Sequence, residues 1–183
     1  MRNLKLIILA SAFIILALSC KKFSPYDPNP KPVLPPISAE GRNTFGLMFG
    51  SEVWTPNFYS ASAILSANYP GILSNPRLHI VCLRKSTRTI GKIDDFTLEY
   101  FSSNISVGTY PLNTNNSKIV AIVKFPDNKE KEYQLEDTGT ITFSRWDMGN
   151  KIASGTFSMT LKDATSGEKV SITEGRFDLK FGD

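Results

Sequence analysis

The residue types that most often carry out catalysis are scarce in this chain. It has one histidine, His79, and two cysteines, Cys20 and Cys82. A Ser-His-Asp site would need His79, which lies among apolar neighbours, and no Gly-x-Ser-x-Gly turn accompanies it. His79 and Cys82 fall on opposite faces of a predicted strand, so they cannot complete a zinc site. We therefore expect no metal, no cofactor, and an inert, buried thiol at Cys82.

Closely spaced carboxylates are the other candidates for chemistry. Hydrolysis of a glycoside requires two of them about 5–10 Å apart in a cleft. The pairs in this chain fall at the ends of predicted strands, within charged turns where solvated surface is the usual explanation. They are Asp94 with Asp95, Glu130 with Glu132, and Glu136 with Asp137. We therefore expect a protein that is not an enzyme, and a carboxylate-based glycan hydrolase is the third-ranked hypothesis.

Aromatic side chains give the positive signal for binding, because rings provide a large contact area at a low entropy cost. The candidate binding surface consists of Trp54, Tyr59, Tyr69 and Trp146. The two tryptophans stand at the ends of predicted strands, where a core position is the competing interpretation. Tyr59 and Tyr69 fall in a segment without a clear strand pattern, and they are the better surface candidates.

The N-terminal residues predict the location of the protein. Residues 1–5 are short and positively charged, and residues 6–18 are apolar with a single exception. A helix needs about 20 apolar residues to cross a bilayer, so this shorter run fits a signal peptide. Ala17-Leu18-Ser19-Cys20 resembles the bacterial lipobox, in which the cysteine is acylated and the chain is cut before it. We expect a signal peptide over 1–19 and a lipid on Cys20. An ordinary signal peptide with an incidental cysteine is the alternative.

Residues 20–39 are the predicted tether. Six prolines lie between residues 25 and 36. Proline fixes φ and lacks an N–H, so this stretch excludes helix and central strand and predicts an extended spacer of about 3 Å per residue. With a lipid on Cys20, Cys82 has no partner for a disulfide. A single domain over 40–183 must then be held together by its core.

Charge gives little reason to expect a nucleic-acid partner. The chain has 21 basic and 17 acidic residues, and loss of two basic residues with the signal peptide lowers the net charge from +4 to about +2. The expected partner is the membrane, reached through the lipid on Cys20. Lys21 replaces the aspartate that retains some lipoproteins at the inner membrane. We expect an outer-membrane protein that faces the periplasm, with surface exposure as the alternative.

Beyond residue 40 the sequence pattern is that of β-strands. Gly50-Ser51, between predicted strands 43–49 and 52–54, favours a type II′ hairpin. The apolar positions shift by one residue near Gly175, which predicts a β-bulge in a long C-terminal hairpin. Further strand patterns occur at 77–85, 96–100, 118–125, 133–135, 141–143, 156–161, 170–172 and 177–181.

These elements predict an antiparallel β-sandwich of about nine or ten strands, and a closed up-and-down β-barrel is the alternative. Residues 57–76 are ambiguous between a short helix and a strand followed by a loop. We favour the strand and loop because the neighbouring segments are strands.

Several short motifs mark the predicted domain. They are Asn43-Thr44-Phe45-Gly46 with Gly50-Ser51-Glu52-Val53-Trp54, then Val107-Gly108-Thr109-Tyr110-Pro111-Leu112, and finally Gly155-Thr156-Phe157-Ser158 with Ile172-Thr173-Glu174-Gly175-Arg176-Phe177-Asp178. They resemble the opening, central turn and ending of a Bacteroidetes lipoprotein family of unknown function. In that family a cysteine commonly follows the first motif. Leu47 stands there in this chain, so any role of that cysteine is lost. The resemblance implies an envelope location and a β fold, and it implies no mechanism.

Two classes of function compete. The first is a non-catalytic binding or interaction module on a lipid tether, with an envelope protein or a glycan as its partner. The second is a small-ligand carrier with a cavity inside a barrel. A carrier requires unfilled volume between inward-facing residues, whereas an interaction module requires a filled core and a distinctive outer surface.

Overall fold

The computed structural model describes residues 32–56, 65–69, 76–85, 93–125, 127 and 129–182. The regular elements in these ranges are strands, and no helix within them is long and apolar enough to cross a membrane. The predicted signal peptide, Cys20 and Tyr59 lie outside the described residues. Pro32–Asp183 forms a single unit, which contains all the strands of the described residues.

Strands form where side chains alternate between interior and solvent. In the strand Ser117–Lys124, for example, Ile119, Ala121 and Val123 are buried, while the intervening side chains are less buried. The ten strands are β1 (Thr44–Phe49), β2 (Glu52–Trp54), β3 (Leu65–Asn68), β4 (Arg77–Lys85), β5 (Ile93–Phe101), β6 (Gly108–Asn113), β7 (Ser117–Lys124), β8 (Glu130–Asp147), β9 (Ile152–Asp163) and β10 (Lys169–Lys180).

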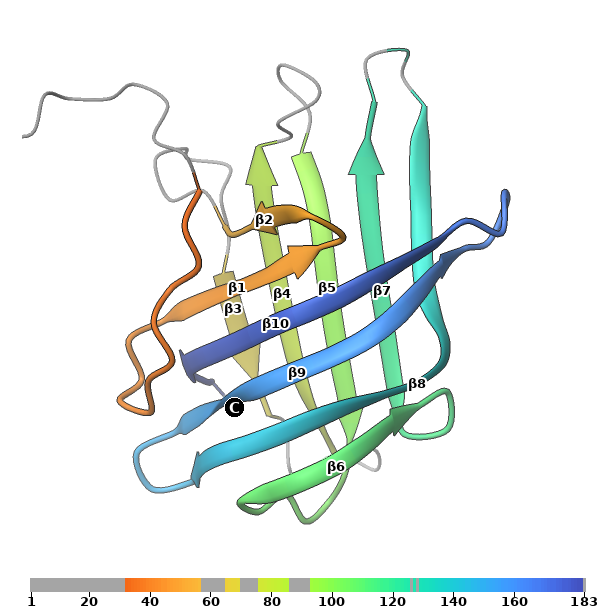
Figure 1. Cartoon of the computed structure of the whole chain (residues 1–183). Helices are drawn as coiled ribbons and strands as arrows, with labels where there is room; N and C mark the ends of the chain where they lie inside the picture. Colours follow the sequence, from red (N-terminus) through yellow and green to blue (C-terminus); the bar gives the residue numbers. More distant parts are fainter. Residues whose placement is uncertain are drawn as a thin grey trace, which may run out of the picture. The chain divides into compact units, whose positions relative to one another are not determined.

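All ten strands belong to one antiparallel sheet with the order β2-β1-β10-β9-β8-β7-β5-β4-β3, and β6 pairs with β8 beside this path. The sheet curls so that two layers lie face to face (Figure 1). We call β2, β1, β10, β9, β8 and β6 the front layer, and β3, β4, β5 and β7 the back layer. The predicted all-β antiparallel fold is therefore confirmed, as a half-barrel that resembles a sandwich.

The long strand β8 connects the two layers. One of its edges pairs with β7 through residues 130–134 and then with β6 through residues 138–143, while β9 runs along the other edge. The register with β9 shifts between Leu135 and Gly139. A Cβ at Gly139 would lie only 2.6 Å from the carbonyl oxygen of Ser158, so glycine permits this close approach. The sequence pattern predicted separate strands at 133–135 and 141–143; the structure joins them into one bent strand.

The far ends of the sheet also meet. Asn68 of β3 forms a parallel bridge with Gly182, which follows β10. The Gly182 amide donates to the Ala67 carbonyl at 2.9 Å, and the Tyr69 amide donates to the Gly182 carbonyl at 3.0 Å. These contacts bring the two ends of the curled sheet together. The sequence pattern fitted both a sandwich and a barrel because inward and outward side chains alternate along the strands of both.

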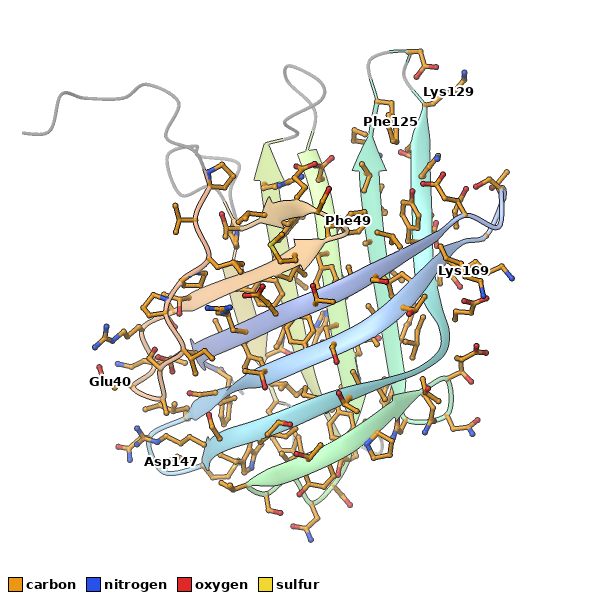
Figure 2. The ribbon with its side chains drawn as sticks, in the orientation of Figure 1. Glu40, Phe49, Phe125, Lys129, Asp147 and Lys169 are labelled. Atoms are coloured by element: carbon orange, nitrogen blue, oxygen red, sulfur yellow. The ribbon has the colours of Figure 1, made fainter. Side chains whose placement is uncertain are left out.

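Side chains project from the strands of both layers (Figure 2), and large apolar ones form a continuous core between the layers. The rings of Phe45 and Phe157 lie 5.6 Å apart, and Phe45 lies at the same distance from Phe96 of the back layer. Phe143 and Phe177 are 5.8 Å apart. All five rings are at most 4% exposed and belong to one continuous core cluster. The described interior is therefore packed rather than hollow.

The structure confirms two of the local predictions at turns and bulges and corrects a third. β1 and β2 form the predicted hairpin, with Gly50 at φ 61°, a value that a type II′ turn requires there. The predicted bulge is confirmed, because the register of β10 shifts between Ile172 and Gly175 and Glu174 adopts φ 49°. The motif interpreted as a central turn, Val107 to Leu112, is instead largely strand β6, an edge strand.

Candidate functional site

The nucleophile and base considered from the sequence do not form a site. Cys82 is fully buried in β4, whereas His79 lies on the opposite, partly exposed face of the same strand. Burial, together with the nearby Asp95 carboxylate, raises the pKa of the Cys82 thiol well above its usual value. The thiol is therefore held in its unreactive, protonated form.

Cys82 is expected to resist thiol reagents in the folded protein. In a chain whose Cys20 is replaced by serine, labelling at pH 8 should be at least about 1000-fold slower than in urea, because the reagent must wait for the core to open. Time-resolved labelling followed by mass spectrometry measures both rates. Labelling of the native protein as fast as of free cysteine would contradict the buried placement.

The carboxylate pair Asp94–Asp95 is split between two environments. Asp94 is completely buried and accepts hydrogen bonds from Arg84 Nε at 3.1 Å and from the Lys124 amide at 2.9 Å. Asp95 points to the opposite face of β5, where Thr97 donates to it at 3.1 Å. Partial burial raises the pKa of Asp95, although the Thr97 hydroxyl and the charge of Lys124 oppose that effect. The two carboxyl groups do not converge on a common substrate position.

Two of the other candidate carboxylates, those of Glu130 and Glu136, pair with basic side chains. Glu130 forms an ion pair with Lys124, and Glu136 accepts Lys169 Nζ at 2.8 Å. The hydrogen bond from Lys169 lowers the pKa of Glu136. Within the part of the chain that the structure describes, no group of three His, Cys, Asp or Glu side chains could hold a metal ion.

Of the aromatic residues proposed from sequence, the three that the structure describes do not gather into an exposed surface. Trp54 is 3% exposed and Tyr69 is 7% exposed, so both belong to the core. Trp146 is half-buried, with the ring of Phe181 stacked on it at 5.0 Å and the ring of Tyr69 edge-on at 4.9 Å. Tyr59 lies outside the described residues. The rings of Trp54, Tyr69 and Trp146 therefore pack mainly against other rings of the core.

The outer side of the front layer has a distinct composition that the sequence motifs did not indicate. Hydroxyl side chains occupy successive outward positions on three adjacent strands, and we call this surface the hydroxyl face. Its members are Thr138, Thr140 and Thr142 on β8, Thr156, Ser158 and Thr160 on β9, and Ser171 and Thr173 on β10. The alternation of Thr and Ser at 140–144 and 156–160 was visible in the sequence, but the alignment of the strands was not.

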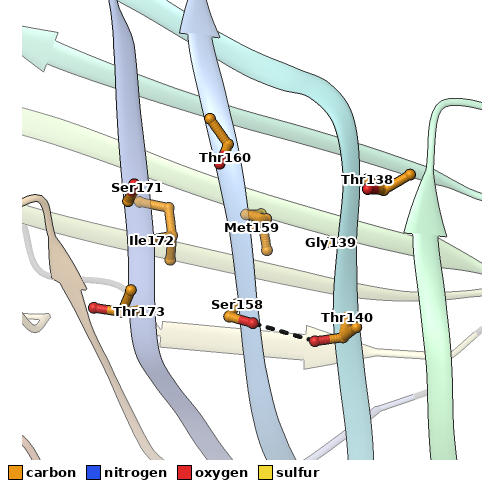
Figure 3. Close-up of a pocket in the computed structure, with 9 residues that line it drawn as sticks. All are labelled: Thr138, Gly139, Thr140, Ser158, Met159, Thr160, Ser171, Ile172 and Thr173. Carbon is orange, nitrogen blue, oxygen red and sulfur yellow. Dashed lines mark hydrogen bonds between the residues drawn. The ribbon is translucent and has the colours of Figure 1, made fainter.

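Strand register aligns these hydroxyl groups. Thr140 pairs with Ser158 and Thr142 with Thr156 across β8 and β9, and Thr160 pairs with Ser171 across β9 and β10. The Thr140 and Ser158 hydroxyl oxygens are 3.2 Å apart (Figure 3). The neighbouring hydroxyls of Thr142 and Thr109 are 2.9 Å apart. A hydroxyl both donates and accepts, so the array offers both functions to a ligand.

Two adjoining hollows lie on the hydroxyl face. The first, of about 340 Å³, is lined by hydroxyl side chains together with Gly139, Met159 and Ile172 (Figure 3). The second, of about 400 Å³, is lined by Ile37, Glu174 and Arg176 in addition to hydroxyls. Thr140 and Ser158 line both hollows. At Gly175 a Cβ would lie 2.5 Å from the Phe157 ring, so a larger residue could not be accommodated beside the second hollow.

The segment before β1, residues 34–42, is fastened to the front layer, and we call it the strap. The Asp178 carboxylate of β10 accepts hydrogen bonds from the amides of Glu40, Gly41 and Arg42 at 3.1, 2.6 and 3.2 Å. It also accepts bonds from the hydroxyls of Ser38 and Ser154. Asp178 is only 1% exposed. One buried carboxylate thus holds the C-terminal part of the strap, from Ser38 to Arg42, by hydrogen bonds.

Two arginines fix the strap at further points. Arg176 Nη1 donates to the Pro35 carbonyl at 3.0 Å, and Arg145 Nη1 donates to the Ala39 carbonyl at 2.8 Å. A Cβ at Gly46 of β1 would lie 2.6 Å from Pro35, so the strap packs directly on the sheet there. Part of the segment that the sequence assigned to a free tether therefore belongs to the front layer's surface.

Replacing Asp178 with asparagine is expected to destabilise the domain by about 2–3 kcal/mol at pH 7. Burial alone would raise the pKa of Asp178, but hydrogen bonds from Ser154, Ser38 and the strap amides outweigh it and lower the pKa to about 2. Because the folded pKa is depressed, the carboxylate stabilises the fold above about pH 4, and that stabilisation is lost as the pH falls toward 2. The difference between wild type and Asp178→Asn should therefore shrink over this window.

Urea unfolding at pH 7, 4 and 2.5 measures this difference. Asp137→Asn, at an exposed position, is the matched control and should change stability by less than about 0.5 kcal/mol. An Asp178→Asn variant as stable as this control at pH 7 would show that the carboxylate does not hold the strap.

The fold and the surface together define an all-β protein with a curled antiparallel sheet, a packed interior and a hydroxyl-lined outer face. A domain of unknown function, DUF6252, is found over residues 88–178. The match begins shortly before β5 and ends at Asp178, so it includes the lining of both hollows except Ile37. The opening motif at residues 43–54 lies outside it. Neither the curated proteins nor the solved structures contain a match to this chain.

Proposed function

We propose that this protein is anchored in the cell envelope by a lipid on Cys20 and that its β domain is a non-catalytic binding module. The proposed location is the outer membrane, facing the periplasm. The lipobox-like motif at residues 17–20 supports the anchor. The observation that carries the binding role is the hydroxyl face, a broad polar surface with two adjoining hollows on the outside of a packed domain.

The alternative of a small-ligand carrier is less well supported. A carrier binds inside its barrel, but the described interior holds one continuous cluster of buried apolar side chains. A carboxylate-based hydrolase is also less well supported, because Asp94 is neutralised by Arg84 and the Glu136 carboxylate by lysines. Recognition at the outer surface, by an envelope protein or a glycan, agrees better with these placements.

The anchor can be tested directly. Mass spectrometry of the N-terminal peptide from native membranes should find an acylated Cys20 as the first residue. Cys20→Ser should move the protein from the membrane fraction to the soluble fraction. A mature chain that begins elsewhere, without a lipid, would refute the anchor and leave the binding role to be judged on its own.

The binding role is tested by capture of the tagged, acylated protein from its native membranes in mild detergent. The expected result is a stoichiometric envelope component that is retained by the wild type and lost from Ser158→Arg, because the arginine would project from the centre of the hydroxyl face. Ser66→Arg is the matched control, since Ser66 is an exposed serine on β3 of the back layer. Equal retention by both variants would contradict the assignment of the hydroxyl face.

A further inference from the structure

The second hollow combines three kinds of surface. The strap supplies an apolar wall at Ile37, whose side chain is 64% exposed. Hydroxyls of β8 and β9 supply a polar floor, from Thr140, Thr142, Thr156 and Ser158. The rim carries a charged pair from the bulge in β10, in which Arg176 Nη2 donates to Glu174 Oε2 at 2.8 Å. This mixture differs from the first hollow, whose described lining residues are all uncharged.

The apolar wall is held in place from both sides. The residue two positions before Ile37, Pro35, accepts a hydrogen bond from Arg176, and the residue after it, Ser38, donates to Asp178. Arg176 therefore lines the hollow and also fastens the strap beside it. Asp178 does not line the hollow and acts on it through the strap, as a positioning residue. The strap is thus a fixed part of the hollow and not a passing segment of tether.

The chemistry of the hollow limits the class of ligand. Its one arginine is already paired with Glu174, so a phosphate or another strong anion would find no free positive charge there among the described lining residues. An apolar ligand would remove from water the donor and acceptor positions that the floor hydroxyls do not use in bonds to other hydroxyls. A neutral sugar ring has hydroxyls for the floor and for the Glu174–Arg176 pair, and it has C–H groups for Ile37. The hollow's volume, about 400 Å³, is in the range of small-ligand sites.

We propose that the second hollow binds one neutral sugar unit, with Ile37 of the strap against the ring, and that Asp178 positions the strap for this contact. This inference rests on the proposed binding role of the hydroxyl face and narrows its partner to a glycan. The strap then belongs to the recognition site.

Methyl NMR of the full acylated chain in detergent micelles tests the proposal. The probes are glucose, galactose, mannose, xylose and N-acetylglucosamine, each titrated separately. At least one sugar should shift the Ile37 methyl signals saturably, with a Kd on the order of 1 mM for a single unit, while those of Val33 and Val107, exposed residues that do not line the hollow, stay in place. No Ile37 shift with any of the five sugars would overturn the proposal.

Matched variants locate the contact. Thr156→Val and Ile37→Ala should each weaken the sugar's affinity by about fivefold or more. Thr160→Val makes the same change as Thr156→Val outside the second hollow, and Val33→Ala likewise shortens an exposed aliphatic side chain outside it. Both should leave the affinity within about twofold. Asp178→Asn should weaken binding and broaden the Ile37 signal as the strap loosens. Equal affinities in Thr156→Val and Thr160→Val would also overturn the site.

The outcomes separate this inference from the broader function. A protein captured through the hydroxyl face, in the absence of any sugar response at Ile37, would leave the binding module intact and overturn the sugar assignment. The absence of both a captured partner and a sugar response would overturn both proposals.

Discussion

Arg84→Met is expected to lower the free energy of unfolding by about 3–5 kcal/mol, since it leaves a buried carboxylate without its countercharge. Arg84 is 3% exposed and Asp94 is completely buried. The arginine donates to Asp94 at 3.1 Å and to Glu52 at 3.0 Å, and its guanidinium lies 5.1 Å from the centre of the Trp54 ring. One side chain therefore joins β4 to both β5 and the β1–β2 hairpin.

Urea unfolding of two further variants distinguishes this effect from a general loss of charge. Arg77 lies on the same strand and pairs with Glu99 at 2.7 Å, but its side chain is 30% exposed. Arg77→Met should therefore cost less than about 1 kcal/mol. The double variant Arg84→Met with Asp94→Leu should recover about 2 kcal/mol relative to additivity, because it removes both charges. Similar losses for Arg84→Met and Arg77→Met would contradict the buried ion pair.

Gly155→Ala is expected to destabilise the domain by about 3 kcal/mol or to prevent folding, because a single methyl group has no space there. A Cβ at Gly155 would lie 2.0 Å from the Thr142 carbonyl oxygen and 2.9 Å from the Phe177 ring. Gly155 pairs with Phe143 and with Phe177 in the middle of the front layer. To relieve the clash between this Cβ and the Thr142 carbonyl, β8 and β9 would have to separate beneath the hydroxyl face.

A thermal melt followed by circular dichroism measures the cost. About 3 kcal/mol corresponds to a fall in Tm of roughly 6–12 °C for a domain of this size. Gly182→Ala is the matched control, since a Cβ at Gly182 would meet nothing within 4 Å, and its Tm should stay within about 2 °C of the wild type. A Gly155→Ala protein with the same Tm as this control would refute the close approach of the strands.

Local sequence patterns predicted most of the strands, because alternation records which side chains face the core. The run at 118–125 and the alternation at 156–161 correspond to β7 and to part of β9. The bulge near Gly175 could also be predicted, since it shifts the apolar positions along the strand by one residue. The bend within β8 could not be predicted from the sequence, because glycine is also a common turn residue and the close contact of Gly139 is with a different strand.

The candidate site depended on contacts that no local pattern contains. Asp178 and Ser38 are 140 residues apart in sequence, and neither residue type signals the partner. Trp54 and Tyr69 were proposed as surface residues because aromatic rings suit both a core and a binding surface, and alternation alone cannot tell which. The hydroxyl face required the order β8-β9-β10 and its register, which bring Thr140, Ser158 and the end of β10 together.

The attachment of the strap determines which strands receive a force applied to the N-terminal side of the chain. A pull on the residues before Pro32 reaches the contacts with Arg176 and Asp178 before it reaches β1. Asp178 stands on β10, which is flanked on both sides by β1 and β9. The force is therefore spread across an interior strand of the front layer instead of peeling the β1–β2 hairpin from its edge.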